Sequence, residues 1–482
     1  MRWMLLLGLM LVGTEQVSAQ ADSSSVQDEL EKVFEEFEEE ALAEEGERLA
    51  QWLIDINEKP GFEFISRVQS LLEVPEGYQR PDSAGGYLGS PRRYFQRFRY
   101  KTKFVSLNLS QEKDAGEAFG RAPAFDFTSM HLSVQDMGLV REGVIGDYAL
   151  NFGQGLLAWN GGAFGKGREV IRGAQRRHRG IRPYASAQET DFFRGAAATV
   201  GHDLQLTLFY SHRKRTASQL EEGIYRFPSS SGLHRTLNEQ GRRNNLQQIT
   251  TGGRLSYGLN KVEIGLNALY NKFNRPVHSQ SHANFQGRNL RVYSLDAEYV
   301  QGSGRLFGEV GMSGNRATAL LLGQQLDFGE TEMVLLYRNY AEDFQSFFGN
   351  AFGEFSGAPR NEEGFYAGIR HQLNDNIRLS AYADHFRHPA ARFRISQPGS
   401  GRDYLGLIEI EVDPQTEAYV LFRHEVKSAE YRMTDLRGRE IRLPGRQHRS
   451  SLRTQIQKQL TPAFRIRSRL ELLGQADRFE SS

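Results

Sequence analysis

The stretch Val262–Asn271, VEIGLNALYN, decides the fold of this chain. Its apolar residues stand at every second position: Val262, Ile264, Leu266, Ala268 and Tyr270. Because successive side chains of a strand point to opposite faces, this pattern predicts a β-strand with one apolar and one polar face. The same period occurs at Leu204–Ser211 and Phe464–Leu472, and strands are expected from Phe62 onward. A soluble sandwich alternates in the same way, so alternation alone leaves the class open.

The connections between the strands discriminate better. The strand signals give about nineteen segments, starting near Phe62, Arg92, Lys103, Phe125, Val140, Phe192, Asp203, Gln248, Lys261, Leu290, Arg305, Ala317, Thr331, Glu363, Ile377, Asp403, Thr416, His448 and Ala463. After even-numbered segments the turns are tight and rich in Gly, Asn, Asp and Pro, the residues that close hairpins. They include Gly201–Asp203, Gly258–Asn260, Gly302–Gly304, Asn374–Asn376 and Asp413–Gln415.

After odd-numbered segments most links are long: Pro75–Pro91, Phe152–Asp191, Arg213–Gln247, Lys272–Asn289, Ala341–Glu362, Arg387–Arg402 and Lys427–Gln447. Gly314–Arg316 is an exception. Short turns on one side and long loops on the other are typical of an outer-membrane barrel, with the short side in the periplasm. The sequence therefore predicts an all-β protein, a transmembrane antiparallel β-barrel over residues 62–482.

The strand count leaves the predicted barrel incomplete. Bacterial barrels of this kind have an even number of strands, and an unpaired edge in lipid is costly. With about 19 strands visible, a complete barrel of about 20 or more is expected. We expect the chain to be truncated at its C-terminus; one miscounted segment is the alternative.

Composition and the N-terminus agree with export. The mean hydropathy of −0.55 over 482 residues is too polar for a bundle of membrane helices. Residues 1–19 resemble a signal peptide, with Arg2, an apolar run at Met4–Gly13 and a small-residue cleavage site at Val17–Ala19. An exported chain without a long apolar segment can span a membrane only as a barrel. The predicted location is the outer membrane of a Gram-negative bacterium, with the N-terminus in the periplasm.

Residues 20–61 form a predicted periplasmic segment of their own. Residues 20–60 contain 14 Asp and Glu against 3 Lys and Arg, and residues 61–482 contain 56 basic and 44 acidic side chains. Apolar residues recur at helical spacing over Asp28–Ile56, which predicts an acidic amphipathic helix. The helix is a candidate docking element for a periplasmic protein partner or a helix folded against the barrel mouth, and an ordinary helix with a solvated acidic face is the alternative.

The least regular stretch is the Gly- and Arg-rich loop 152–195, which lies between predicted strands. Long irregular links in a compact fold are usually functional or disordered. Its basic side chains are candidate anion or ligand contacts: Lys166, Arg168, Arg172, Arg176, Arg177, Arg179 and Arg182. Pairing of these cations with inward carboxylates or with lipid phosphates is the alternative. The inward carboxylates are Asp147, Glu169, Glu298, Glu409 and Glu411.

The ends of this loop are expected to be anchored in adjacent strands by Asp147, Tyr148, Gln154 and Arg194. The loop is either a plug in the lumen or an external docking loop. Its run Gly161–Gly167 departs from the Walker pattern, since Asn160 and Gly167 stand where that pattern has Gly and Ser or Thr. Glycines at left-handed turns explain the run better.

Catalytic and metal motifs are not found in the sequence. There is no HExxH, no Gly-x-Ser-x-Gly and no cysteine. The histidines are scattered, and His385 with His388 near Asp384 is only a weak metal candidate. We therefore predict no enzyme, no catalytic residue, no metal and no cofactor.

Several phrases resemble a family of Bacteroidota outer-membrane proteins described as helix-hairpin-helix domain-containing proteins. The matching phrases are Tyr87–Pro91, Glu112–Glu117, Gly146–Tyr148, Phe152–Gly155, Gly165–Gly167, Arg182–Tyr184 and Phe192–Gly195. The resemblance covers roughly residues 62–480 and implies a large outer-membrane barrel. It carries over no catalytic residue. The family's helix-hairpin-helix repeats have no counterpart between Ile56 and Phe62, so nucleic acid is an unlikely partner.

The preferred function is the binding or passage of a solute or polymer across the outer membrane, through an arginine-lined lumen or plug loop. Two alternatives remain: a non-transporting scaffold that docks a periplasmic partner, and a component of nucleic-acid uptake. Outer-membrane lipid is the expected surrounding of the barrel. The sequence does not identify the substrate.

Overall fold

The computed structural model describes residues 60–70, 73, 75–119, 125–162, 165–228, 232–279, 282–354, 359–392, 395–434, 438–462 and 464–479. The predicted signal peptide 1–19 and helix Asp28–Ile56 lie outside these residues. Gly61–Ser482 forms one compact unit.

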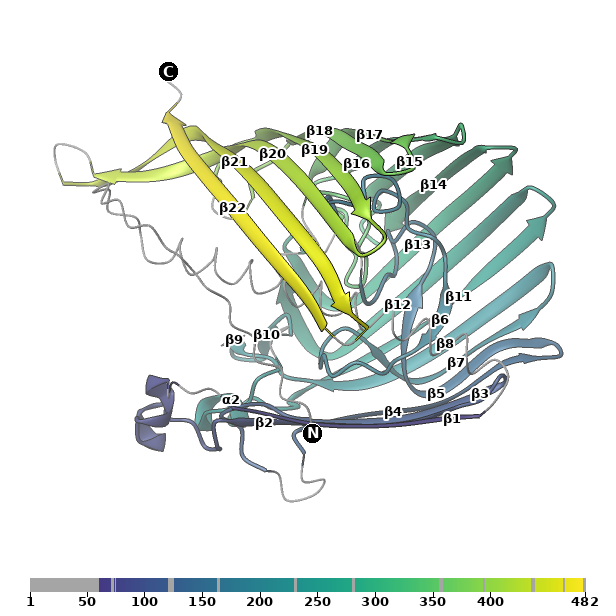
Figure 1. Ribbon diagram of the computed structural model, residues 1–482. Coiled ribbons are helices and arrows are strands. Elements are labelled where there is room, and N and C mark those ends of the chain that lie inside the picture. The colour runs from purple at the N-terminus through teal and green to yellow at the C-terminus, as the bar shows by residue number, and fades with distance from the viewer. Residues whose placement is uncertain are drawn as a thin grey trace. The chain divides into compact units, whose positions relative to one another are not determined.

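The unit is built from one sheet of 22 strands. Nineteen of them follow one another in chain order, each antiparallel to the next, and form the wall (Figure 1). The wall strands are β1 (Gly61–Ser70), β2 (Arg92–Lys101), β3 (Val105–Lys113), β4 (Phe127–Met137), β5 (Val140–Asn151), β7 (Phe193–Gly201), β8 (Leu204–Arg215), β11 (Leu246–Leu259), β12 (Val262–Ser279), β13 (Phe285–Gln301), β14 (Gly304–Ser313), β15 (Thr318–Asp327), β16 (Thr331–Tyr340), β17 (Glu362–Asn374), β18 (Ile377–His388), β19 (Gly399–Asp413), β20 (Thr416–Thr434), β21 (Glu440–Thr461) and β22 (Phe464–Phe479). The predicted count of nineteen is confirmed.

The remaining elements lie in the connections. Strand β6 (Gly180–Pro183) pairs with the end of β5. Strands β9 (Gln219–Glu221) and β10 (Ile224–Arg226) form a small hairpin, and β10 also pairs in parallel with β12. The short helices are η1 (Glu76–Tyr78), η2 (Asp82–Ala84) and α2 (Leu237–Gly241). No helix in this described part of the chain has the length and hydropathy needed to cross a bilayer.

The alternation of short and long connections is present in the structure. Counted along the wall, every connection after the second, fourth, sixth and later even-placed strands has two or three residues. Examples are the turn between β4 and β5, the fourth and fifth wall strands, and the turn between β13 and β14, the tenth and eleventh. We call this end of the wall the turn end and the opposite end the loop end. Two links expected to be long are mostly strand, because β12 extends to Ser279 and β20 to Thr434. The predicted loops Lys272–Asn289 and Lys427–Gln447 were therefore wrong in extent, since backbone pairing continues into long hairpins there.

Burial is inverted relative to a soluble sandwich. In β8, the apolar side chains Leu204 and Leu208 are each 58% exposed, whereas Thr207 and Ser211 on the opposite face are at most 4% exposed. In β12, Leu266 is 56% exposed while Asn267 is fully buried. Water would disfavour a belt of exposed leucines, whereas lipid accommodates it. The sheet is therefore the wall of a transmembrane β-barrel of the outer-membrane type, with an apolar outer face and a polar inner face.

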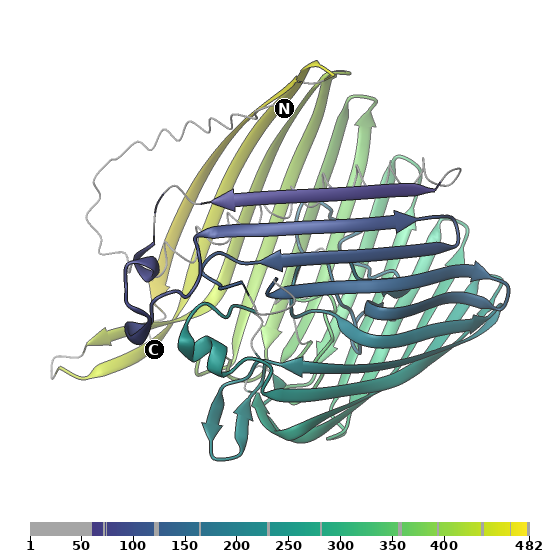
Figure 2. The same ribbon diagram turned by 90° about the horizontal axis from the view of Figure 1, so that it is seen from below.

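The two end strands of the wall differ from the rest. Strands β1 and β22 both start at the turn end, so they run in the same direction, and the described residues show no pairing between them. In Figure 2 the purple β1 and its neighbours lie in front of the yellow and green C-terminal strands and run across their direction. Residues on both faces of β22 are mostly exposed, whereas the inner faces of the central strands are buried. The packed interior is therefore concentrated along the central strands.

Candidate functional site: the lumen segment

Residues 152–192, between β5 and β7, fold against the inner face of the wall (Figure 1). We call them the lumen segment. The backbone oxygen of Ala185 accepts hydrogen bonds from Arg97 of β2 and Ser110 of β3. On another part of the wall, Tyr366 of β17 donates to the oxygen of Val170 at 2.7 Å. The segment therefore lies inward against the wall, and its role as a plug stays a prediction.

Apolar packing holds the middle of this segment. Phe152, Leu156, Leu157, Val170 and Ile171 are at most 1% exposed and belong to the main core cluster. The cluster also contains inward aromatic and aliphatic residues of the wall from β13 to β20. Where the segment packs, the inner face of the wall therefore contributes this apolar cluster as well as charged side chains such as Glu309 and Asp384. A core of this kind restricts movement of the segment, because displacement would expose apolar surface.

The segment enters the lumen through a tight glycine turn. Gly153 and Gly155 have φ values of 53° and 86°, in the left-handed region that favours glycine. Glu309 of β14 accepts hydrogen bonds from the backbone N–H groups of Gln154 at 2.7 Å and Leu156 at 3.0 Å. A Cβ on Gly153 would lie 2.8 Å from the Glu309 carboxylate. The turn therefore fits closely around one buried carboxylate that the wall supplies.

The four predicted anchors lie where the segment joins the wall. Asp147 and Arg194 are paired neighbours in β5 and β7, and their side chains form a two-point ion pair at 2.6 and 2.8 Å. Tyr148 is fully buried and donates to the backbone oxygen of Tyr210 at 2.8 Å. The Gln154 side-chain oxygen accepts from the backbone N–H of Arg176 at 3.1 Å, which ties the start of the segment to its middle.

Lys166 is the most constrained cation of the segment. Its side chain is 4% exposed and forms ion pairs with Glu354, with Asp384 of β18 at 2.9 Å and with Asp403 of β19 at 3.2 Å. Burial by itself would lower the pKa of Lys166, but the three carboxylates reverse this effect and raise the pKa above its ordinary value. Lys166 is therefore a charged structural group, enclosed by its partners and not presented to a solute.

The wall extends this charge network. Arg338 of β16 is fully buried and pairs with Asp384 at 2.8 Å and with Glu362 at 2.5 Å. Arg423 of β20 pairs with Asp403 at 2.8 Å. The neighbouring link 341–361 supplies Glu354, which also pairs with Lys427 at 2.6 Å. Burial would raise the pKa of Glu354, but Lys166 and Lys427 more than offset this and lower it. Cations and carboxylates of five wall strands thus meet at the segment.

Arg168 and Arg176 also have partners within the protein. Arg168 pairs with Glu409 at 2.9 Å and stacks over the ring of Tyr419 at 4.1 Å. Arg176 is 5% exposed and donates to the backbone oxygens of Asn350 and Gly173. Burial lowers the pKa of Arg176 to about 10, so it stays charged at neutral pH. For Arg168, the alternative to ligand contact that the sequence left open, pairing with an inward carboxylate such as Glu409, is the one observed.

The other four predicted cations face solvent: Arg172, Arg177, Arg179 and Arg182. The pKa of Arg177 is lowered, mainly by burial and then by the nearby Arg305, Arg172 and Arg179, while Glu298 opposes the shift. Arg305 is the second residue of β14. Glu142, the third residue of β5, faces Arg182 and accepts from the backbone N–H of Ile181. Since both strands start at the turn end, this arginine face lies toward the turn end of the lumen.

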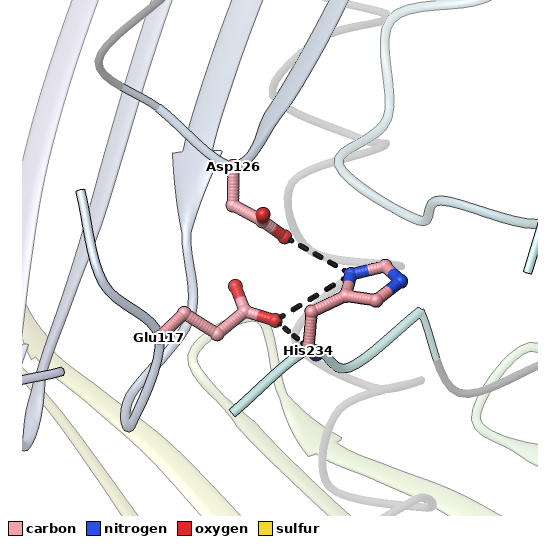
Figure 3. A group of neighbouring side chains, drawn as sticks. All are labelled: Glu117, Asp126 and His234. Atoms are coloured by element: carbon pink, nitrogen blue, oxygen red, sulfur yellow. Dashed lines mark hydrogen bonds and ion pairs between the residues drawn. The ribbon is translucent and has the colours of Figure 1, made fainter. Parts of the chain in front are cut away.

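A second group of polar side chains lies at the loop end and was missed by sequence reasoning. Glu117 comes from the link between β3 and β4, Asp126 from the residue just before β4, and His234 from the link between β8 and β11 (Figure 3). Their ligand atoms all lie within 4.8 Å of one another. Their sequence spacing gives no motif, because more than 100 residues separate His234 from the two carboxylates.

The carboxylates of this group are strongly coupled. Burial and the neighbouring Asp126 raise the pKa of Glu117 to about 8. The neighbouring side chains of His234, Glu117 and Arg243 outweigh burial and lower the pKa of Asp126. The weak metal candidates named from sequence do not form a comparable group in the described residues: His385 bonds to Tyr404, and His388 bonds to the oxygen of Asn361.

A cavity of about 370 Å³ adjoins the group. Its lining includes Asp126, Glu189, Thr190, Arg213, Arg215 and His234. Burial, followed by repulsion from Asp126 and other carboxylates, raises the pKa of Glu189 to about 9. Arg213 donates to the backbone oxygens of Glu189, Thr190 and Phe192, which fixes the end of the lumen segment. The end of the lumen segment therefore forms part of the lining of the loop-end cavity.

Comparisons with known proteins give similar folds at low identity. Wzi, described as an outer-membrane protein involved in group 1 capsule assembly in Escherichia coli and a carbohydrate-binding β-barrel, is 13% identical over 78% of this chain and 82% of its own, with a TM-score of 0.37. Pseudomonas aeruginosa OpdQ is 9% identical over 87% of this chain and 96% of its own, also at 0.37. OmpT, an outer-membrane protein of Vibrio cholerae, is 8% identical with a TM-score of 0.27.

No protein-family model matches the sequence, and no curated protein matches it significantly. At these TM-scores the likenesses carry no argument about function.

Proposed function

We propose that this outer-membrane barrel binds an anionic solute or polymer and passes it across the membrane, with the lumen segment as the gate. The arginine face is the proposed contact surface for the anion. One observation carries the proposal: the segment encloses Lys166 and Arg176 but leaves Arg172, Arg177, Arg179 and Arg182 exposed to solvent. A structural segment has no need of four exposed cations on one face.

The electrostatics of this face favour an anion. Arg305, Arg172 and Arg179 lie near Arg177 and, together with burial, disfavour its charged form. A bound carboxylate or phosphate would relieve this repulsion, and guanidinium groups bind such groups at two points. Low-dielectric walls around a water-filled passage strengthen the field and raise the local concentration of anions.

The ion pairs of Lys166 supply the closed state of the proposed gate. Opening would require Lys166 to leave Glu354, Asp384 and Asp403, and the apolar residues of the segment to leave the core. An anion could favour this by pairing with the arginines in the open arrangement only. A ligand shifts such an equilibrium by the difference between its affinities for the two states.

Conductance in planar bilayers tests the proposal. Wild-type protein is expected to show small, anion-selective currents, and deletion of residues 156–190 is expected to widen the pore and remove its selectivity for anions. The currents of both proteins are compared under a salt gradient. A deleted barrel that folds, as judged by heat-modifiable migration in gels, but carries no current would refute passage through the lumen.

A scaffold that docks a periplasmic partner is the second candidate. The observation in its favour is the charge of residues 20–60, which precede β1 and contain 14 acidic and 3 basic side chains, together with the start of β1 at the turn end. With the turn end in the periplasm, this segment would be accessible to partners. Pull-down from periplasmic extract with and without residues 20–60 tests the idea, and an unchanged set of partners would contradict it.

A further inference from the structure

Glu117, Asp126 and His234 converge at the loop end (Figure 3). The Nδ1 atom of His234 lies 3.5 Å from an oxygen of Asp126 and 4.0 Å from an oxygen of Glu117. All three side chains are nearly enclosed, with exposed fractions of 7% for His234, 2% for Glu117 and 3% for Asp126. The group thus combines one imidazole nitrogen with two carboxylates, a donor set that binds transition metals.

Two of these donors have no hydrogen-bond partner in the described residues. They are Nδ1 of His234 and the Asp126 oxygen that faces it. A buried polar atom without a partner is uncommon, since each such atom costs free energy. The two atoms face each other at 3.5 Å, and a cation bound by both would satisfy both.

The surroundings fix the donors in suitable orientations. The Nε2 atom of His234 lies 2.8 Å from the hydroxyl of Thr216, so an N–H at Nε2 would leave the Nδ1 lone pair free for a metal. Metal-binding histidines in general use the second nitrogen in this way. Arg243 holds the other oxygen of Asp126 at 2.7 Å, and the Glu117 oxygen that lies 4.0 Å from Nδ1 also accepts from the backbone N–H of His234 at 2.6 Å.

The backbone around His234 is also held in place. Thr236 begins helix α2 with a capping box, in which its side chain accepts from the N–H of Glu239 and the Glu239 side chain accepts from the N–H of Thr236. The backbone oxygen of Arg235 accepts from Leu88 at 2.8 Å. His234 is therefore presented by a local motif and by a contact with the link between β1 and β2.

We propose that Glu117, Asp126 and His234 form a binding site for a divalent transition-metal ion of the Zn²⁺ type, which joins the link after β3 to the link after β8. In a tetrahedral zinc site the metal–ligand bonds are about 2.0–2.2 Å, so ligand atoms lie about 3.4 Å apart. The separation of 3.5 Å between Asp126 and His234 already meets this, whereas Glu117 lies 4.0 Å from His234 and within 4.8 Å of Asp126 and has to move toward the other two ligands.

Three protein ligands leave one position of a tetrahedral ion open. The cavity of about 370 Å³ is lined by Asp126 and His234, so this position faces the cavity. It provides an entry path for the ion and room for a water molecule or an anionic group as the fourth ligand. Magnesium and calcium are poorer candidates, because they prefer a full shell of oxygen ligands.

A protonated His234 paired directly with Asp126 is the competing explanation of the same geometry. It requires no metal and predicts that the protein binds Zn²⁺ no better than a variant without the histidine. The two explanations therefore differ in metal content and in the effect of His234→Ala.

The test uses the full-length protein purified in detergent without a polyhistidine tag. After treatment with EDTA it is dialysed against Zn²⁺, and bound metal is measured by mass spectrometry and the affinity by calorimetry. We expect about one ion per chain that Mg²⁺ does not displace, and a loss of affinity of at least tenfold in His234→Ala and in Asp126→Asn. Substitution with Co²⁺ is expected to give the visible absorption of a four-coordinate ion.

The matched control is His385→Ala, which removes a histidine that bonds to Tyr404 away from the group. It is expected to keep the metal. Heat-modifiable migration in gels shows whether each variant folds, and the Co²⁺ spectrum of the wild-type protein remains informative if a variant does not. Wild-type protein that retains no Zn²⁺ after dialysis, or His234→Ala with wild-type affinity, would overturn the proposal.

Discussion

Two regions of the lumen segment use the same kind of side chain in opposite ways. Lys166 and Arg176 are enclosed by protein, where Lys166 pairs with three carboxylates and Arg176 donates to backbone oxygens. On the turn-end face, Arg172, Arg177 and Arg179 are exposed beside one another. A buried charge is tolerated only when partners compensate for the loss of water, whereas exposed like charges remain solvated. The enclosed cations therefore hold the segment, and the exposed ones are available to a ligand.

The largest expected effect comes from Lys166→Met. Removing the cation leaves Glu354, Asp384 and Asp403 buried without their shared partner, which costs about 3–5 kcal/mol. The segment should then leave the lumen for part of the time. Because the chain contains no cysteine, a single reporter at Leu157→Cys, where the leucine is 1% exposed, can be labelled with a maleimide when the segment opens.

Faster labelling is expected in Lys166→Met than in the parent reporter protein. Lys261→Met, which changes an exposed lysine in the tight turn between β11 and β12, serves as the control and should label at the parent rate. Equal labelling in all three proteins would show that the Lys166 network does not hold the segment closed.

The next largest effect is expected from Gly153→Ala. The added methyl group would meet the Glu309 carboxylate at 2.8 Å at a φ of 53°, so both strain and contact disfavour it. Gly161 has a φ of 88° but open space around its Cβ, so Gly161→Ala carries backbone strain alone. We expect Gly153→Ala to destabilise the closed segment by about 1–3 kcal/mol. The Leu157→Cys reporter should therefore be labelled faster in the Gly153→Ala protein than in the Gly161→Ala protein. Equal labelling of the two variants would show that contact with Glu309 does not contribute to the effect.

A smaller effect follows from His178, which stacks on Phe152. Burial and the nearby Arg254 lower the pKa of His178 to about 3 from an ordinary value of 6.5. An open segment binds more protons than the closed one between these values, so the closed state is most stable above pH 6.5 and weakens as the pH falls toward 3. Because one histidine titrates, the ratio of closed to open protein changes by at most about tenfold per pH unit.

Hydrogen exchange of residues 152–192 at pH 5 and pH 7.5, corrected for the intrinsic rates, measures this effect. Protection should decrease at pH 5 in the wild-type protein and much less in His178→Phe. His202→Phe, at an exposed tight turn, is the control and should behave as wild type. A pH response that persists unchanged in His178→Phe would assign the sensitivity to other groups.

The smallest effect on the closed state is expected from replacing Arg172, Arg177, Arg179 and Arg182 together by glutamine. Labelling of the Leu157→Cys reporter should stay at the parent rate, because these side chains are exposed and repel one another. Selectivity should change instead, with the reversal potential in a salt gradient moving away from the anion limit. Unchanged selectivity would contradict the proposed role of the arginine face.

The sequence determined the wall. Nineteen strand starts, the alternation of short turns and longer links, and the neighbouring positions of Asp147 and Arg194 followed from the residues alone. These features are local, since a period of two and a hairpin turn depend on residues close together in the chain. The extent of β12 and β20 was underestimated, because pairing across a hairpin continues through residues without strict alternation.

The tertiary structure alone decided the interior. Lys166 and Arg172 have the same charge and lie six residues apart, yet only Lys166 meets Asp384 and Asp403, which follow more than 200 residues later. His234 likewise meets Glu117 and Asp126 only because two loop-end links come together. Such contacts depend on which strands face each other across the lumen. Composition and period carry no record of that arrangement, so the roles of the charged residues emerge only in the folded barrel.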